Sequence, residues 1–341
     1  MIPLSVLDLC PIVQGGDAAR SFRNSLALAR HAEQLGFRRY WLAEHHGMPG
    51  IASAATAVLM AHVAAGTQTI RIGAGGIMLP NHAPMVIAEQ FGTLAALHPG
   101  RIDLGLGRAP GSDPATARAL RRHLDTDAER FPDDVVELMD LLSDQPRSPV
   151  RAVPGQGARV PVWILGSSLF GAQLAALLGL PFAFASHFAP QMMLQAVALY
   201  RQHFRPSAQQ DKPHVMLGFN VFAATSDEQA EWLASSMQQS FVNLRSGRPG
   251  PLPPPVAGYR QRLDGPLGAM LESVLAHSAI GSPATVLARM QAFVDLTQAD
   301  ELMITSQIFD HTARLASYGI VAGLQGQLKA ASASQHRSLA A

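Results

Sequence analysis

Residues 4–43 contain a complete strand–helix–strand unit: LSVLDL at 4–9, AARSFRNSLALARHAEQL at 18–35 and RYWLA at 39–43. The outer two segments are short and apolar, as in buried strands, whereas the middle segment is longer and amphipathic, as in a surface helix. Gly36 directly follows the middle segment and is typical of a helix end. This unit predicts two parallel strands that are joined by a helix.

The same alternation continues along the chain and predicts the fold. Eight candidate strands lie at 4–9, 39–43, 70–74, 102–106, 162–165, 182–185, 216–223 and 301–305, and candidate helices lie at 18–35, 54–65, 84–97, 133–142, 171–178, 191–204, 227–241, 285–296 and 310–324. Eight strands that are each followed by a helix favour an α/β fold of the (β/α)8 TIM-barrel type. A doubly wound sheet, which usually has five to seven strands, is the alternative.

We expect residues 1–325 to form a single barrel domain with two insertions, near 143–160 and 246–266. Both segments are rich in proline and glycine and lack a helical or strand period. A segment as long as 246–266 without periodicity is usually a lid, a binding loop or a disordered linker. Residues 326–341 are rich in Ala, Ser and Gln, and we expect them to form a flexible tail.

The composition excludes several classes of protein. The 341 residues carry a formal net charge of +1 and no block of like charges, so we expect neither a nucleic acid nor a membrane surface as a partner. Cys10 is the single cysteine, which excludes an internal disulfide and a multi-cysteine zinc site. The N-terminal residues do not resemble a signal peptide, and no apolar run is long enough for a transmembrane helix. We therefore predict a cytoplasmic protein.

Polar residues at the ends of the predicted strands are the candidates for chemistry, because barrel active sites lie at the C-terminal ends of the strands. The second strand is followed by Glu44, His45 and His46. One histidine could give or take a proton beside a ligand while Glu44 fixes its tautomer. The alternative is a histidine that only satisfies a loop carbonyl. We expect no metal, because the chain lacks a His-Glu-x-x-His motif.

Glycines and an arginine follow the next two strands. Gly75 and Gly76 would let the backbone approach a flat ligand closely, although an ordinary bulge is an equal alternative. After the fourth strand, Gly105-Leu106-Gly107 is only a weak dinucleotide signal, because Pro110 replaces the third glycine. The adjacent Arg108 suits an anion such as a phosphate, or it pairs with a neighbouring carboxylate.

The fifth strand runs through Gly166, Ser167 and Ser168 into a helix. Backbone N–H groups at a helix start, together with two hydroxyls, can bind a phosphate. An ordinary N-cap serine is the alternative. Arg108 and Ser168 would lie on the same rim of a barrel, so we expect them to converge on one phosphate.

These segments together resemble the luciferase-like flavin-dependent monooxygenase family. The resemblance runs from Leu4 to about Leu324, and it is strongest in WLAEHH at 41–46, in IMLP at 77–80 through HPGR at 98–101, and in PVW at 161–163 through GLP at 179–181. The family has the bacterial luciferase barrel, so the resemblance implies that fold as well.

The resemblance implies roles for individual residues. His45 matches the proton-transferring histidine, Gly75 and Gly76 match a cis peptide beneath the flavin ring, and Arg108 and Ser168 match residues that grip the flavin phosphate. Gly166 and Ser167 belong to the same expected cofactor site, and residues 246–266 match a mobile loop that shields the flavin. Two departures stand out: Gly107 replaces a cysteine and Ser167 replaces a carboxylate of luciferases, so light emission is not expected.

The implied function is that of a flavin-dependent monooxygenase, in which reduced FMN and O2 form a C4a-peroxide that oxidises a small organic substrate. A separate NAD(P)H:flavin reductase would supply the reduced FMN. The alternatives are a deazaflavin-dependent hydride-transfer enzyme and a flavin-binding protein without catalysis. The resemblance also implies a homodimer, for which the small residues at 52–65 would permit close packing.

Overall fold

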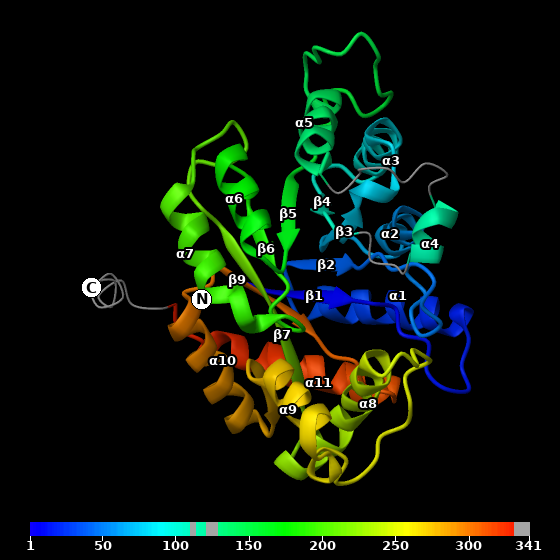
Figure 1. Cartoon of the computed structure of the whole chain (residues 1–341), viewed down its shortest axis with the longest axis vertical. Helices are drawn as coiled ribbons and strands as arrows, with labels where there is room; N and C mark the ends of the chain where they lie inside the picture. The colour runs from blue at the N-terminus through cyan, green and yellow to red at the C-terminus, as the bar shows by residue number, and fades with distance from the viewer. Residues whose placement is uncertain (110–113, 121–128, 331–341) are drawn as a thin grey trace.

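The computed structural model describes residues 1–109, 114–120 and 129–330, and its centre is a closed β-barrel (Figure 1). The barrel order is β1–β2–β3–β4–β5–β6–β7–β9, with β9 pairing again with β1, and every pair is parallel. The strands are β1 (Leu4–Asp8), β2 (Arg39–Leu42), β3 (Arg71–Met78), β4 (Ile102–Gly107), β5 (Val162–Gly166), β6 (Phe182–Phe184), β7 (Val215–Ala223) and β9 (Glu301–Thr305). The predicted (β/α)8 barrel is confirmed, and closure of the sheet excludes the doubly wound alternative.

Helices surround the barrel. They are α1 (Ala18–Gln34), α2 (Thr56–Ala65), α3 (Pro84–Leu97), α4 (Pro114–Leu120), α5 (Phe131–Leu142), α6 (Leu169–Leu178), α7 (Met193–His203), α8 (Asp227–Arg245), α9 (Gly265–Leu275), α10 (Pro283–Thr297) and α11 (His311–Leu324). Their buried sides pack on the apolar outer surface of the strands in one large core. None of the helices in the described part of the chain combines the length and apolar character that crossing a bilayer requires.

A ninth strand, β8 (Ser278–Gly281), lies outside the barrel and was not predicted. It pairs with the C-terminal half of β7, from Asn220 to Ala223. Four residues that include a serine and a glycine carry too little apolar character to stand out as a strand. The β7–β8–α8 region has its own small core, to which α8 and α9 contribute.

Charged residues fill the barrel at the N-terminal ends of its strands. Arg39 donates from Nε to Glu301 at 2.7 Å and from Nη1 to Asp103 at 2.8 Å. Burial alone would raise the pKa of Glu301, but a hydrogen bond with His214 and the charge and hydrogen bond of Arg39 hold that pKa at about 2. Because these buried charges are paired, they are tolerated in the barrel. They fill this end of the barrel.

The two predicted insertions differ in how they are anchored. The segment near 143–160 packs on the main core through Ala152 and Val160, which are buried, and its surface carries an ion pair from Arg159 to Asp144 at 2.7 Å. In the segment 246–266, Leu252 is buried and exchanges backbone hydrogen bonds of 2.8 Å with Ile12 and Gln14. Figure 1 shows this yellow segment running beside the blue loop between β1 and α1. Its mobility stays a prediction, as does that of the tail, which lies mostly outside the described residues.

Candidate functional site

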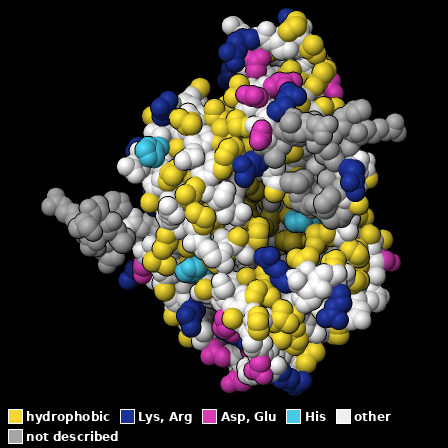
Figure 2. Space-filling view, in the orientation of Figure 1, with side chains coloured by type: hydrophobic (Ala, Val, Ile, Leu, Met, Phe, Trp, Pro, Cys, Tyr) yellow, Lys and Arg dark blue, Asp and Glu magenta, His cyan; other side chains and the backbone are white. Residues whose placement is uncertain are grey.

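A largely apolar pocket of about 590 Å³ opens at the C-terminal ends of the barrel strands. Figure 2 shows a hollow in this face with mostly hydrophobic walls and a histidine side chain visible inside it. The floor is the apolar layer inside the barrel, formed by Leu7, Trp41, Met216 and Met303 among others. Apolar walls with few polar groups are typical of sites for small organic ligands.

The segment after α8 forms part of the pocket wall. Pro249, Gly250 and Leu252 line the cavity, together with Phe241 of α8. A Cβ added at Gly50, in the loop after β2, would lie 2.2 Å from the carbonyl oxygen of Gly250. The two loops therefore meet backbone to backbone at the pocket mouth. The position agrees with the role of a lid that the sequence predicts for 246–266.

His45 lies in the loop after β2 and lines the pocket. Its Nδ1 is buried and has no hydrogen-bond partner in the described part of the chain. Burial lowers the pKa of His45 below 6.5, and His46 lowers it further, while Glu44 acts in the opposite direction. The imidazole is therefore neutral at pH 7 and can either give or accept a hydrogen bond. This state suits proton transfer to a bound ligand.

Glu44 engages His46 and His82 rather than His45. Both Nε2 atoms lie 2.8 Å from Oε1 of Glu44. Although burial alone raises the pKa of Glu44, the hydrogen bonds and charges of His82 and His46 hold it below its ordinary value. The sequence predicts that Glu44 fixes the tautomer of the proton-transferring histidine, whether His45 or His46. In the structure Glu44 pairs with His46, so it does not fix the tautomer of His45.

In the described part of the chain, Glu44, His46 and His82 form the group whose possible ligand atoms lie close enough together to bind a metal ion. These atoms lie within 4.8 Å of one another. The two 2.8 Å contacts are ordinary charge-assisted hydrogen bonds, which explain the arrangement without an ion. We therefore interpret Glu44, His46 and His82 as a hydrogen-bonded network, of which His46 lines the pocket.

The glycines after β3 form an irregular strand end. The peptide bond between Gly75 and Gly76 is cis, as the family resemblance implies. The pairing of β3 with β4 shifts register between Ala74 and Ile77. A Cβ at Gly76 would lie 2.8 Å from the carbonyl oxygen of Gly105 on β4, so the two backbones approach too closely for any side chain there. Gly75 lines the pocket.

Arg108 and the start of α6 lie on the same rim, as predicted. Gly107 on β4 pairs with Leu165 on β5, so the residues that follow the two strands leave the barrel side by side. The guanidinium of Arg108 lies over the ring of Phe170, 4.1 Å from its centroid. Ser168 is the N-cap of α6 but makes no side-chain capping hydrogen bond. The hydroxyl and the first N–H groups of α6 are thus available to an anion beside Arg108.

The predicted site residues therefore fall into two neighbouring groups. His45 and Gly75 line the pocket, whereas Arg108, Gly166, Ser167 and Ser168 lie on the rim beyond its lining. Gly76 connects the two groups, because its backbone abuts Gly105 of β4, two residues before the end of that strand. Pro110, which stands where a dinucleotide motif would have its third glycine, lies outside the described part of the chain.

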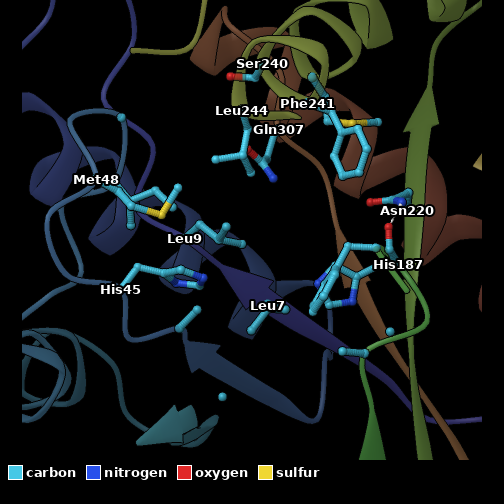
Figure 3. A pocket seen from close by; sticks show the side chains of 18 of the residues that line it. Leu7, Leu9, His45, Met48, His187, Asn220, Ser240, Phe241, Leu244 and Gln307 are labelled. Carbon is cyan, nitrogen blue, oxygen red and sulfur yellow. Dashed lines mark hydrogen bonds between the residues drawn. The ribbon is translucent and has the colours of Figure 1, made fainter. Parts of the chain in front are cut away.

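Several pocket residues were not found by sequence analysis. The pocket is also lined by His187 after β6, Asn220 of β7, Ser240 and Leu244 of α8, and Gln307 after β9 (Figure 3). A signal existed for His187, since it follows a predicted strand end as directly as His45 does. The α8 residues gave no such signal, because their entry into the pocket depends on how the helix packs.

Comparisons with known proteins agree with the fold. A model of the family described as luciferase-like monooxygenase matches residues 4–299. A luciferase-like monooxygenase of Escherichia coli K12 is 54% identical over 328 residues, which are 96% of this chain and 98% of the relative.

Two solved structures extend the comparison. The crystal structure of apo-MsnO8 has a TM-score of 0.88 and 33% identity, covering 97% of this chain and 100% of the other. The oxygenating constituent of 3,6-diketocamphane monooxygenase from Pseudomonas putida, a Type II Baeyer–Villiger monooxygenase in complex with FMN, has a TM-score of 0.70 and 16% identity, covering 94% and 96%.

Proposed function

The chain belongs to the luciferase-like monooxygenase family, and on this premise we propose that it uses reduced FMN and O2 to oxidise a small organic substrate. One oxygen atom would enter the substrate and the other would leave as water, while FMN becomes oxidised. Reduced FMN supplies the electrons for this reaction when it is bound. The protein would bind and orient the cofactor and the substrate, exclude water from them and transfer protons.

The observation that carries the proposal is the joint position of Arg108 and the uncapped start of α6. Arg108 is held over Phe170, and Ser168 leaves its hydroxyl and the adjacent N–H groups without a capping bond. A phosphate at this place would receive charge-assisted hydrogen bonds and would sit at the positive end of a helix. Gly166 and Ser167 complete the turn, so these residues fit the phosphate of FMN.

The flavin ring would lie toward the pocket, against Gly75 and Gly76. Gly75 lines the pocket, and neither glycine carries a side chain, so a flat ring could lie close to this backbone. The complex of the camphane enzyme with FMN is consistent with this choice of cofactor on the same barrel. The apolar pocket beyond the ring would hold the substrate and exclude water from the reaction.

His45 would exchange the proton that oxygen transfer requires. Its ring is neutral at pH 7 and its Nδ1 is not engaged by the described residues. A general acid–base group of this kind typically contributes about 10²–10⁴-fold to a rate. The segment 246–266 would act as the lid, with Leu252 as its apolar anchor against the loop after β1.

We also propose two partners. A separate flavin reductase would deliver reduced FMN, and a second copy of the chain would pack against α2. Val58 on α2 is 71% exposed and Leu97 at the end of α3 is 64% exposed, so both apolar side chains could pack against a second copy. Light scattering of the wild type and of Val58→Glu tests the dimer: the proposal expects a dimer that the substitution weakens.

An anaerobic titration tests the cofactor. Reduced FMN should bind with micromolar or tighter affinity, and reduced deazaflavin cofactor should bind at least tenfold more weakly. Preference for the deazaflavin would instead support the hydride-transfer alternative and would overturn the proposed function.

A further inference from the structure

His187 presents a second imidazole to the pocket. It follows β6 directly and lines the cavity, with part of its surface exposed there. Figure 3 shows its ring and that of His45 on either side of Leu7. Nothing in the proposed proton transfer or cofactor binding uses this residue.

The surroundings of His187 define its tautomer. Nδ1 is buried and has no hydrogen-bond partner in the described residues. A Cβ added at Gly218 would lie 2.2 Å from this nitrogen, so the Cα hydrogen in that direction points at it. A lone pair on Nδ1 makes a weak favourable contact with this hydrogen, whereas an N–H would collide with it. The proton of the neutral ring therefore belongs on Nε2.

The ring is neutral throughout the physiological range. Burial lowers the pKa of His187 to about 4, and the nearby His45 lowers it in the same direction. Because Gly218 covers Nδ1, the ring can offer only its Nε2–H group to a ligand in the pocket. A neutral donor suits an uncharged acceptor, because no buried charge has to be compensated.

The backbone of His187 is fixed to the neighbouring strand. Asn220 on β7 donates from Nδ2 to the carbonyl oxygen of His187 at 2.6 Å. The hydroxyl of Ser186 donates to the carbonyl oxygen of Gly218 at 2.7 Å. Both bonds tie the turn after β6 to β7, so the direction of the donor is set before any ligand arrives. Such positioning lowers the entropy lost on binding.

From this arrangement we propose that His187 binds the substrate, donating a hydrogen bond from Nε2 to an uncharged acceptor, such as a carbonyl oxygen, at one end of an otherwise apolar molecule. The inference rests on the proposed function in that it takes the pocket as the substrate site. Among the described residues that line the pocket there is no Asp or Glu, so an ammonium group would find no counter-charge. The lining does contain Arg245, so its charge disfavours a cation as well, and the substrate class is an acceptor-bearing apolar compound rather than an amine.

Nitrogen-15 spectra of histidine-labelled protein test the tautomer. The signal of His187 is assigned by its loss in His187→Gln, with His187→Phe as a second variant and the exposed His203→Gln as the matched control. We expect a neutral ring with the proton on Nε2 from pH 5.5 to 8. A proton on Nδ1, or titration near the ordinary pKa of 6.5, would overturn the inference.

Two probes of equal shape test the acceptor. Cyclohexanone carries a carbonyl oxygen, and methylenecyclohexane replaces that oxygen with a CH2 group. Cyclohexanone should shift the Nε2 signal of His187, and His187→Phe should weaken its binding about three- to tenfold, the value of one neutral hydrogen bond. Methylenecyclohexane should bind both proteins alike. No shift at the solubility limit, or equal shifts with both probes, contradicts the proposal.

The two proposals can fail separately. The titration with reduced FMN is carried out on the same wild-type protein. Reduced FMN that does not bind, with cyclohexanone still shifting His187, would overturn the proposed function and leave the ligand contact intact. Normal FMN binding without a shift would overturn the ligand contact alone.

Discussion

The guanidinium of Arg108 lies 4.1 Å from the centroid of the Phe170 ring, which links the end of β4 to the first turn of α6. The aromatic face orients the charge without neutralising it, because a cation over a ring keeps its hydrogen-bond donors free. A flexible arginine is thereby directed to the same rim as the N-terminus of a helix. This link places the two sequence signals side by side, at the position that we propose for the flavin phosphate.

Arg108→Ala should weaken the binding of reduced FMN about 10- to 100-fold, because one or two charge-assisted hydrogen bonds to the phosphate are lost. Reduced riboflavin, which lacks the phosphate, should bind the variant and the wild type equally. The exposed Arg289→Ala on α10 serves as the control. Equal losses for FMN and riboflavin would show that Arg108 does not contact the phosphate.

His45→Ala should leave the affinity for reduced FMN within about threefold, while lowering the turnover of any substrate that the wild type oxidises by about 10²-fold or more. The reason is that His45 offers a neutral imidazole to the pocket and takes no part in the anion site. Turnover and binding are measured on the same preparations. Unchanged turnover would remove His45 from the mechanism.

Acid should destabilise the fold through His187. Its pKa is about 4 in the folded protein and near 6.5 in the unfolded chain, so the unfolded chain takes up the proton first as the pH falls. The free energy of unfolding should be constant above about pH 6.5 and should fall by about 2 kcal/mol between pH 6.5 and 5 from this residue.

Urea unfolding across this pH range checks the effect. His187→Gln should be less sensitive to acid than the wild type. His311, whose pKa burial also lowers to about 4, contributes in the same direction and remains present in both proteins. Identical pH dependence of the two proteins would contradict the burial of His187 as a neutral ring.

Two glycines on β4 should respond differently to alanine. A Cβ at Gly105 would lie 2.3 Å from the carbonyl oxygen of Ala74 on β3. This oxygen belongs to the backbone, which cannot move aside as a flexible side chain can. Gly105→Ala should therefore lower the free energy of unfolding by about 1–3 kcal/mol or more. At Gly107 the nearest atom would be 3.8 Å away, so Gly107→Ala should be tolerated. Thermal unfolding of the two variants compares them, and equal stabilities would refute the close approach of β3 and β4.

Most of the barrel could be predicted from the sequence because its strands are buried on both faces. A run such as 102–106 is apolar or glycine at nearly every position. β8 could not be predicted in this way, because it pairs with the protruding end of β7 and carries little apolar surface. Its existence depends on the length of β7, which is a tertiary property.

The candidate site could be predicted where a residue directly follows a strand. His45, Gly75 and Arg108 were found because the ends of parallel strands must meet at one rim. Met237 and Phe241 reach the pocket from α8, and Leu252 reaches it from a segment without periodicity. No pattern in the sequence specifies which helix face or loop residue will cover the cavity, since this follows from packing at the barrel mouth.

Rapid mixing with oxygen tests whether the protein controls the reaction of reduced FMN with O2. The protein is loaded with reduced FMN without oxygen and is then mixed with oxygenated buffer while the flavin spectrum is recorded. We predict oxidation in two phases, through a transient species that differs from both reduced and oxidised FMN. A single phase at the rate of free reduced FMN in the same buffer would contradict this prediction.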